Sequence, residues 1–92
     1  MYIYEVYKNK KLLCKAGRED LNHLSAILNT FCDKDIPDDM RHSINVGGYV
    51  SNGKTEKFPD WFAQESLQVG DEITIKLTEG ELADPPKRER LD

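Results

Sequence analysis

The spacing of the apolar residues changes partway along the chain, and this change limits the possible folds most strongly. Residues 2–8 and 11–16 alternate with a period of two on either side of Asn9-Lys10. Because Asn tolerates the left-handed backbone of a two-residue turn, these segments predict a β-hairpin. After Gly17 the apolar residues recur every three or four positions, at Leu21, Leu24, Ile27, Leu28 and Phe31. This second spacing predicts an amphipathic helix whose apolar stripe covers one face of a sheet.

Alternation returns in the second half of the chain. Residues 43–50 predict a strand with glycines near its centre. The pair Asn52-Gly53 then predicts a tight turn into a short returning strand at 55–58. Residues 72–78 alternate most regularly of all and predict the last strand.

Prolines and one tryptophan mark the segments between these elements. Pro37 disfavours helical geometry at Ile36 and predicts a loop from 33 to 41. Pro59 is expected to end the short strand, and Trp61 to lie in a helical turn that places its ring on the core. The predicted core draws on the helix and on the strands, and consists of Ile3, Val6, Leu21, Leu24, Ile27, Leu28, Phe31, Ile44, Val46, Trp61, Ile73 and Ile75.

A chain of 92 residues is expected to build one small core, which leaves little room for an enclosed substrate cavity. The predicted domain spans residues 1–80. Residues 81–92 hold two prolines and seven charged residues but only two leucines, and predict a flexible charged tail. The basic run from Lys87 to Arg90 is interpreted as solubilising, with binding to an acidic partner as the alternative.

Charge and hydropathy exclude several classes of partner. The 13 basic and 17 acidic residues give a net charge of -4 and are interspersed, so no basic stripe is available for nucleic acid. The sequence shows neither a signal peptide nor an apolar run near the roughly 18 residues of a membrane span. We therefore expect a cytoplasmic protein without a membrane or nucleic-acid partner. Cys14 and Cys32 are interpreted as reduced thiols near the core, with a redox pair as the alternative.

One helix across a mixed sheet of four to five strands is an α+β arrangement of the β-grasp type. The chain resembles ubiquitin-like proteins over residues 1–80, in the order and length of the elements. The resemblance is closest in the loop Ile36 to Asp39, the strand Ile44 to Gly48, the hairpin Asn52 to Thr55, and the final strand Ile73 to Leu77 that runs out to Gly80.

The ubiquitin-like resemblance implies a modifier that partner enzymes activate and conjugate. Conjugated modifiers of this family end in a Gly-Gly carboxylate, whereas here the single Gly80 is followed by twelve more residues. A peptidase would therefore have to process the chain near Gly80. The chain is also similar to small uncharacterised bacterial proteins, in Ala16-Gly17, residues 24–28 and 46–48, Trp61 and residues 69–72, and that likeness implies no activity.

No recognisable catalytic or metal-binding pattern accompanies this fold. His23 and His42 lack a nucleophile at a motif position and are interpreted as surface or capping residues. The loop with Asp33, Asp35, Asp38 and Asp39 lacks the ligand pattern of a calcium loop and is interpreted as solvated. Gly47-Gly48 is too short to cradle a phosphate and predicts a bulge or a close approach of backbones. No catalytic, cofactor or metal residues are therefore predicted, and the chain is not expected to be an enzyme.

Protein binding is the function that these observations favour. The expected module presents a sheet face or its tail to a protein partner, with Tyr4, Tyr49 and Gly80 as the candidate binding residues, since aromatic side chains are common in interfaces. One form of this hypothesis is the modifier processed near Gly80. The alternative is a stand-alone bacterial interaction protein, of the immunity or anti-defence type, that blocks a partner enzyme with its acidic loop.

Overall fold

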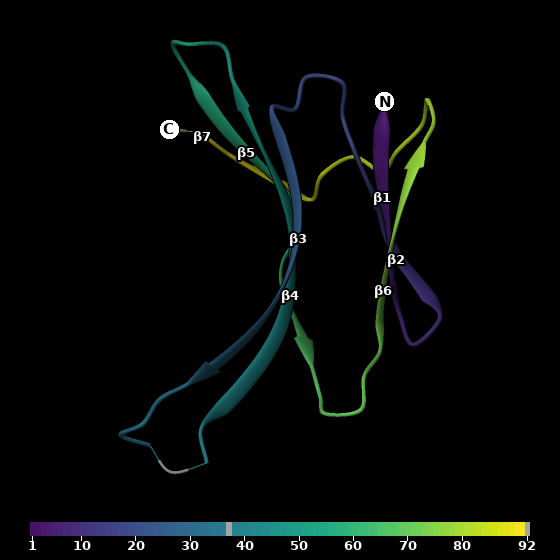
Figure 1. The fold of residues 1–92 in the computed structure, drawn as a ribbon. Helices are drawn as coiled ribbons and strands as arrows, with labels where there is room; N and C mark the ends of the chain where they lie inside the picture. The colour runs from purple at the N-terminus through teal and green to yellow at the C-terminus, as the bar shows by residue number, and fades with distance from the viewer. Residues whose placement is uncertain (37, 92) are drawn as a thin grey trace.

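Strands make up all the regular structure in the computed structural model, which describes residues 1–36 and 38–91. Their bounds, in chain order, are β1 (Tyr2–Lys8), β2 (Lys11–Ala16), β3 (His23–Cys32), β4 (Met40–Ser51), β5 (Glu56–Leu67), β6 (Ile73–Glu79) and β7 (Arg88–Leu91). They form two antiparallel sheets, with strand orders β2-β1-β6 and β3-β4-β5-β7 (Figure 1). The α+β prediction of a β-grasp with a helix across a mixed sheet is therefore wrong.

The segment expected to be the helix is strand β3. Each residue from His23 to Cys32 pairs in register with β4, between Tyr49 and Met40. Leu24 and Ala26 pack against the core, so the alternation of a strand places Ile27 on the opposite, outer face. Apolar residues on both faces of a strand reproduce the three-and-four spacing of a helix, which explains why the spacing was misleading.

Four of the predicted strands are confirmed. The opening hairpin has the predicted bounds, and Asn9 and Lys10 take the left-handed backbone of its turn, with φ of 50° and 70°. Strand β6 falls within one residue of its prediction. Strand β4 includes the predicted segment 43–50 but begins earlier, at Met40. The prediction for Pro37 lies outside the described residues.

Strand β5 is longer than the sequence predicted. Pro59 and Trp61 both lie within it, so neither the strand end at Pro59 nor the helical turn at 60–63 is found. The β4–β5 register shifts between Val46 and Gly47, near this proline, and Pro59 itself pairs with Glu89 of β7. Proline is tolerated at such an irregularity because the missing N–H is not needed by a regular ladder.

The core lies between the two sheets, which face each other across it (Figure 1). Its buried members come from both sheets, and are Val6, Cys14, Ala16, Ile44, Val46, Trp61 and Leu67. Leu21, Leu24 and Ile73 of the predicted core are partly buried against this cluster, while Ile3 is buried but lies apart from it. The other predicted core residues are exposed instead, namely Ile27, Leu28, Phe31 and Ile75.

The segment from residue 81 to residue 91 belongs to the fold and does not form a tail. Strand β7 pairs with β5 from Lys57 to Asp60. Ahead of it, the Asp84 N–H donates to the Lys15 carbonyl at 2.8 Å, and the Trp61 Nε1–H donates to the Asp84 carbonyl at 2.8 Å. These partners come from distant parts of the sequence, so the composition of residues 81–92 alone gave no sign of them.

Half of the β3–β4 hairpin extends beyond the smaller sheet, toward the lower left of Figure 1. We call this part, residues 27–36 and 38–42, the arm. The principal extents of 44 × 33 × 17 Å describe a flattened molecule with one long dimension. Because β2, β1 and β6 do not reach over the arm, its side chains lack the opposing layer that buries the rest of the hairpin.

Candidate protein-binding surface

The arm exposes large apolar side chains on both of its faces. Leu28 points to the same side as the core but is 65% exposed, whereas Ile27 and Phe31 point to the outer side and are 50% and 47% exposed. Ile36 and Met40, near the end of the arm, are exposed as well. Isolated exposed apolar residues are common, but several on one element mark interaction surfaces.

A groove runs between the inner side of the arm and the β5–β6 turn. Leu28, Thr30 and His42 line it from the arm, and Leu67, Val69 and Ile73 are among the residues that line the other side. Its volume is about 230 Å³. The Thr30 hydroxyl and the His42 ring are hydrogen-bonded, with 3.0 Å between Oγ1 and Nδ1. Leu28 and Val69 thus expose apolar surface on the two sides of this groove.

The end of the arm carries the acidic loop. Four aspartates, Asp33, Asp35, Asp38 and Asp39, lie between the two strands. The Asp33 carboxylate accepts the Asp35 N–H at 2.9 Å, and the Asp39 carboxylate lies 3.7 Å from the Arg41 guanidinium. Both Asp35 and Asp38 are exposed. The arm therefore combines an apolar stem with a negatively charged end, a pattern that suits a basic partner surface.

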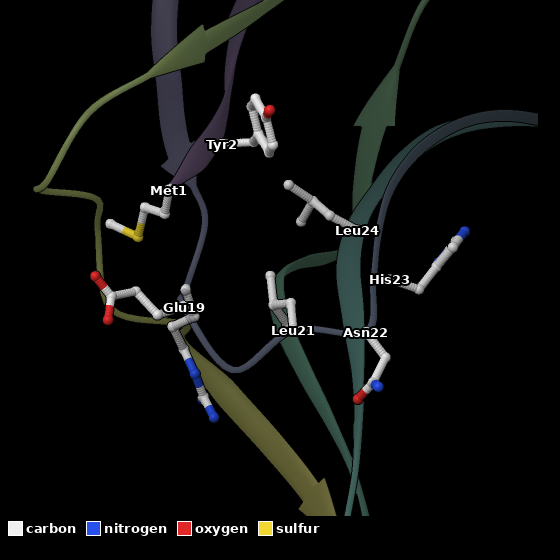
Figure 2. A pocket seen from close by; sticks show the side chains of 8 residues that line it. Met1, Tyr2, Glu19, Leu21, Asn22, His23 and Leu24 are labelled. Atoms are coloured by element: carbon white, nitrogen blue, oxygen red, sulfur yellow. The ribbon is translucent and has the colours of Figure 1, made fainter.

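A second pocket lies at the N-terminal end of β3, next to Asn22. Figure 2 shows Tyr2, Leu21 and Leu24 pointing into this pocket, while His23 points away from it. Its volume is about 270 Å³. The guanidinium of Arg18, at the rim, bonds Asp20 at 2.6 Å and Glu89 at 2.9 Å. Since this charge is already paired with protein carboxylates, the pocket offers chiefly apolar contact.

The structure does not bring the three predicted binding residues together. Tyr4 is half-buried against the core. Tyr49 lies on the outer face of the larger sheet, where its ring is 5.4 Å from that of Phe58 and its hydroxyl donates to Glu56 at 2.9 Å. The Gly80 N–H donates to the Met1 carbonyl at 3.0 Å, and the Gly80 carbonyl accepts a hydrogen bond from the N-terminal amino group of Met1 at 2.9 Å. None of the three belongs to the arm.

The residues that form the arm surface were assigned to the core from the sequence. Ile27, Leu28 and Phe31 belong to the apolar stripe that the sequence predicts to be buried, but all three are exposed. One signal was present: the adjacent pair Ile27-Leu28 places apolar residues on both faces if the segment is a strand. The sequence did not reveal Val69, which is 92% exposed on the far side of the groove.

The two cysteines lie in different environments. Cys14 is buried, and burial, with Asp84 nearby, raises the pKa of its thiol to about 11. Such a thiol stays protonated near neutral pH and is a poor nucleophile. Both cysteines are free, and Cys32 is exposed on the arm. Within residues 1–36 and 38–91, no three His, Cys, Asp or Glu side chains gather as metal ligands would.

Gly47 and Gly48 mark a close approach of backbones, as the sequence suggested. A Cβ at Gly48 would lie 3.0 Å from the His23 backbone oxygen, and one at Gly47 would lie 3.3 Å from the Pro59 backbone oxygen. In the described part of the chain, no helix is long and apolar enough to cross a membrane.

Comparison with known proteins gave no relatives. No protein-family model matches the chain, and neither the curated proteins nor the solved structures yielded a match. These comparisons do not bear on the resemblance to ubiquitin-like proteins or to small bacterial proteins.

Proposed function

We propose that this chain is a small, non-catalytic, cytoplasmic protein-binding module whose arm is the binding surface. The observation that carries the proposal is the exposure of Ile27, Leu28 and Phe31 on a hairpin that projects past the smaller sheet. Covering a large apolar side chain contributes about 1.5–3 kcal/mol. Because Ile27, Leu28 and Phe31 are about half exposed, a partner that covers them gains about half of that amount from each, before the cost of association.

The acidic loop favours one form of this function. Asp33, Asp35, Asp38 and Asp39 stand at the end of the arm, beyond the apolar residues. A basic cleft of a partner enzyme would receive this end, while the apolar stem packs against its rim. This is the blocking mode expected of an immunity or anti-defence inhibitor, and it needs no catalytic residue or cofactor in this chain.

The modifier form of the hypothesis receives less support from the contacts around Gly80. An activating enzyme would need Gly80 as a free carboxylate, but its backbone is bound to Met1. Processing there would also remove Asp84 and β7, which bond Lys15, Trp61 and β5. Intact-mass measurement of the chain from its native cells tests this form directly, since loss of residues 81–92 is a defined mass change.

Affinity capture with paired variants tests the arm as the binding surface. A tagged chain is compared with a Leu28→Asn/Phe31→Asn variant and with Leu12→Asn, a control on β2 whose side chain is 46% exposed. We expect wild type and Leu12→Asn to bind the same protein, and the arm variant to bind it about 100-fold less tightly or worse. Equal affinity for the arm variant would overturn the proposal.

Neutralising the acidic end separates the inhibitor form from other kinds of binding. With Asp33→Asn/Asp35→Asn, we expect slower association and a weaker dependence on salt, because steering by the negative end is lost. Activity of a captured enzyme provides the second measurement. If that enzyme is as active in the complex as when it is free, the inhibitor form is wrong.

A further inference from the structure

The four outermost strands of the two sheets differ in how well they are protected against pairing with another strand. Strands β2, β6 and β7 each carry at least two charged residues, as KLLCKA, ITIKLTE and RERL show. Strand β3, with the sequence HLSAILNTFC, carries no Asp, Glu, Lys, Arg, Pro or Gly over ten residues. Natural edge strands are commonly shielded by charge, proline, bulges or shortness, and β3 has none of these.

The ladder along β3 is also regular. All ten residues pair with β4 without a register shift, unlike the β1–β2 and β4–β5 ladders. In a regular antiparallel strand, alternate residues direct both N–H and C=O to the same side. About half of the β3 residues therefore direct these groups to the outer edge, where no other strand lies among residues 1–36 and 38–91.

The side chains along this edge favour a neutral, apolar neighbour. Leu28 is exposed on the inner face, and Ile27 and Phe31 on the outer face. A strand added beside β3 covers all three at once and also satisfies the outward backbone groups. A charged strand would instead place unpaired charges beside these side chains.

We propose that the outer edge of β3 pairs antiparallel with β3 of a second copy of this chain. The proposal goes beyond the proposed function and does not depend on it, although both use the arm. Two copies with a net charge of -4 each repel one another over most of their surface. Contact between copies is therefore favoured where charge is absent, and among residues 1–36 and 38–91 β3 is the one outermost strand without Asp, Glu, Lys or Arg.

A two-fold axis through Leu28 gives this pairing its geometry. Leu28 then lies beside Leu28 of the second copy, and Ser25 lies beside Phe31 of the second copy. The two larger sheets join into one continuous sheet of eight strands, because each contributes four. Antiparallel pairing also sends the two acidic loops to opposite ends of a ladder about 30 Å long, which keeps their charges apart.

Molar mass in solution, measured by light scattering across a concentration series, tests the pairing. We expect wild type to approach twice 10.6 kDa, and Leu28→Lys to raise the dissociation constant by about tenfold or more, since two lysines would face each other. Leu12→Lys, on the charged β2 edge, should leave the dimer intact. Both leucines are exposed, so neither change removes a core side chain.

Cysteine cross-linking checks the register. In a Cys32→Ser background, Leu28→Cys should give a disulfide-linked dimer on mild oxidation, and Leu12→Cys should not. A wild-type chain that stays monomeric up to about 1 mM, or a dimer indifferent to Leu28→Lys, would overturn the self-pairing.

The two proposals fail in different ways. A monomeric wild type whose partner capture still depends on Leu28 and Phe31 overturns self-pairing and leaves the proposed function standing. A dimer through β3, with capture of other proteins unaffected by arm substitutions, supports self-pairing and overturns binding of a different partner through the arm.

Discussion

Ile44 and Leu28 occupy the same rung of the β3–β4 ladder and point to the same side, yet their environments differ completely. Ile44 on β4 is 0% exposed, whereas Leu28 on β3 is 65% exposed. The boundary of the core thus runs between two neighbouring side chains of one sheet. What buries a residue here is the second sheet, and the arm begins where that sheet stops.

The comparison separates stability from binding within a single hairpin. Apolar residues of the covered part fill the space between the sheets, while those of the arm contribute little to folding of the isolated chain. Apolar side chains kept exposed are a liability for aggregation, unless a partner covers them. Substitutions in the two parts should therefore act on different measurements.

Trp61→Ala, in the covered part, should have the largest effect. Trp61 is 1% exposed, and its Nε1–H bonds the Asp84 carbonyl at 2.8 Å. Its removal leaves a cavity between the sheets and also frees the segment before β7. We expect the free energy of unfolding, measured with urea, to fall by about 3–5 kcal/mol. A fall below about 1 kcal/mol would show that the ring is not part of the core.

The paired residues Ile44 and Leu28 provide the sharpest test of where the core ends. Ile44→Ala should lower the free energy of unfolding by about 2–5 kcal/mol. Leu28→Ala removes a side chain of the same size but should cost less than about 1 kcal/mol, measured at a chain concentration where association does not contribute. Equal losses for the two variants would mean that the second sheet covers the arm in solution.

Glycines that contact Ile3 extend the comparison to close backbone packing. A Cβ at Gly17 would lie 2.7 Å from the backbone oxygen of Tyr2, whereas one at Gly80 would meet only the end of the Ile3 side chain, at 3.2 Å. Gly17→Ala should therefore cost about 1–3 kcal/mol, and Gly80→Ala less than about 1 kcal/mol. Thermal unfolding of the two variants checks this order, and a reversed order would contradict the packing around Ile3.

The covered part was also the more predictable part from sequence. Strand β2 and the centre of β4 follow an alternation in which one face is buried, which is the assumption behind interpreting such patterns. Of the predicted core, Val6, Ile44, Val46 and Trp61 lie in the buried cluster. Local turn chemistry at Asn9 was sufficient to set the first hairpin.

The rest could not be predicted because its determinants are not local. Strand β3 violates the one-buried-face assumption, since Ile27 and Leu28 are exposed on opposite faces. Pro59 is accommodated by a register shift that depends on β4, and residues 81–91 are ordered by contacts with Lys15 and Trp61. The arm surface was consequently assigned to the core, and the candidates Tyr4, Tyr49 and Gly80 were chosen elsewhere.

The smallest expected effect concerns Asp71, in the turn that borders the groove. Its carboxylate accepts the Asn9 side-chain N–H at 2.9 Å and the Gln68 N–H at 2.7 Å. These two hydrogen bonds, that of Asn9 first, lower the pKa of Asp71 below its ordinary value of 3.8. A carboxyl whose pKa is lower in the folded state stabilises the fold above the unfolded value, and this stabilisation is lost as the pH falls through the folded value.

Asp71→Asn should therefore make the chain slightly less stable at pH 7, and the difference from wild type should shrink as the pH drops below about 4. Urea unfolding at several pH values measures it. Both proteins keep Asp20, whose pKa is lowered by Arg18, so subtracting their curves isolates Asp71. Gly70 and Asp71 line the groove opposite the arm. The same variant therefore also tests whether partner binding at the groove needs a rigid β5–β6 turn. A difference that stays constant with pH would mean that the carboxylate does not hold the turn.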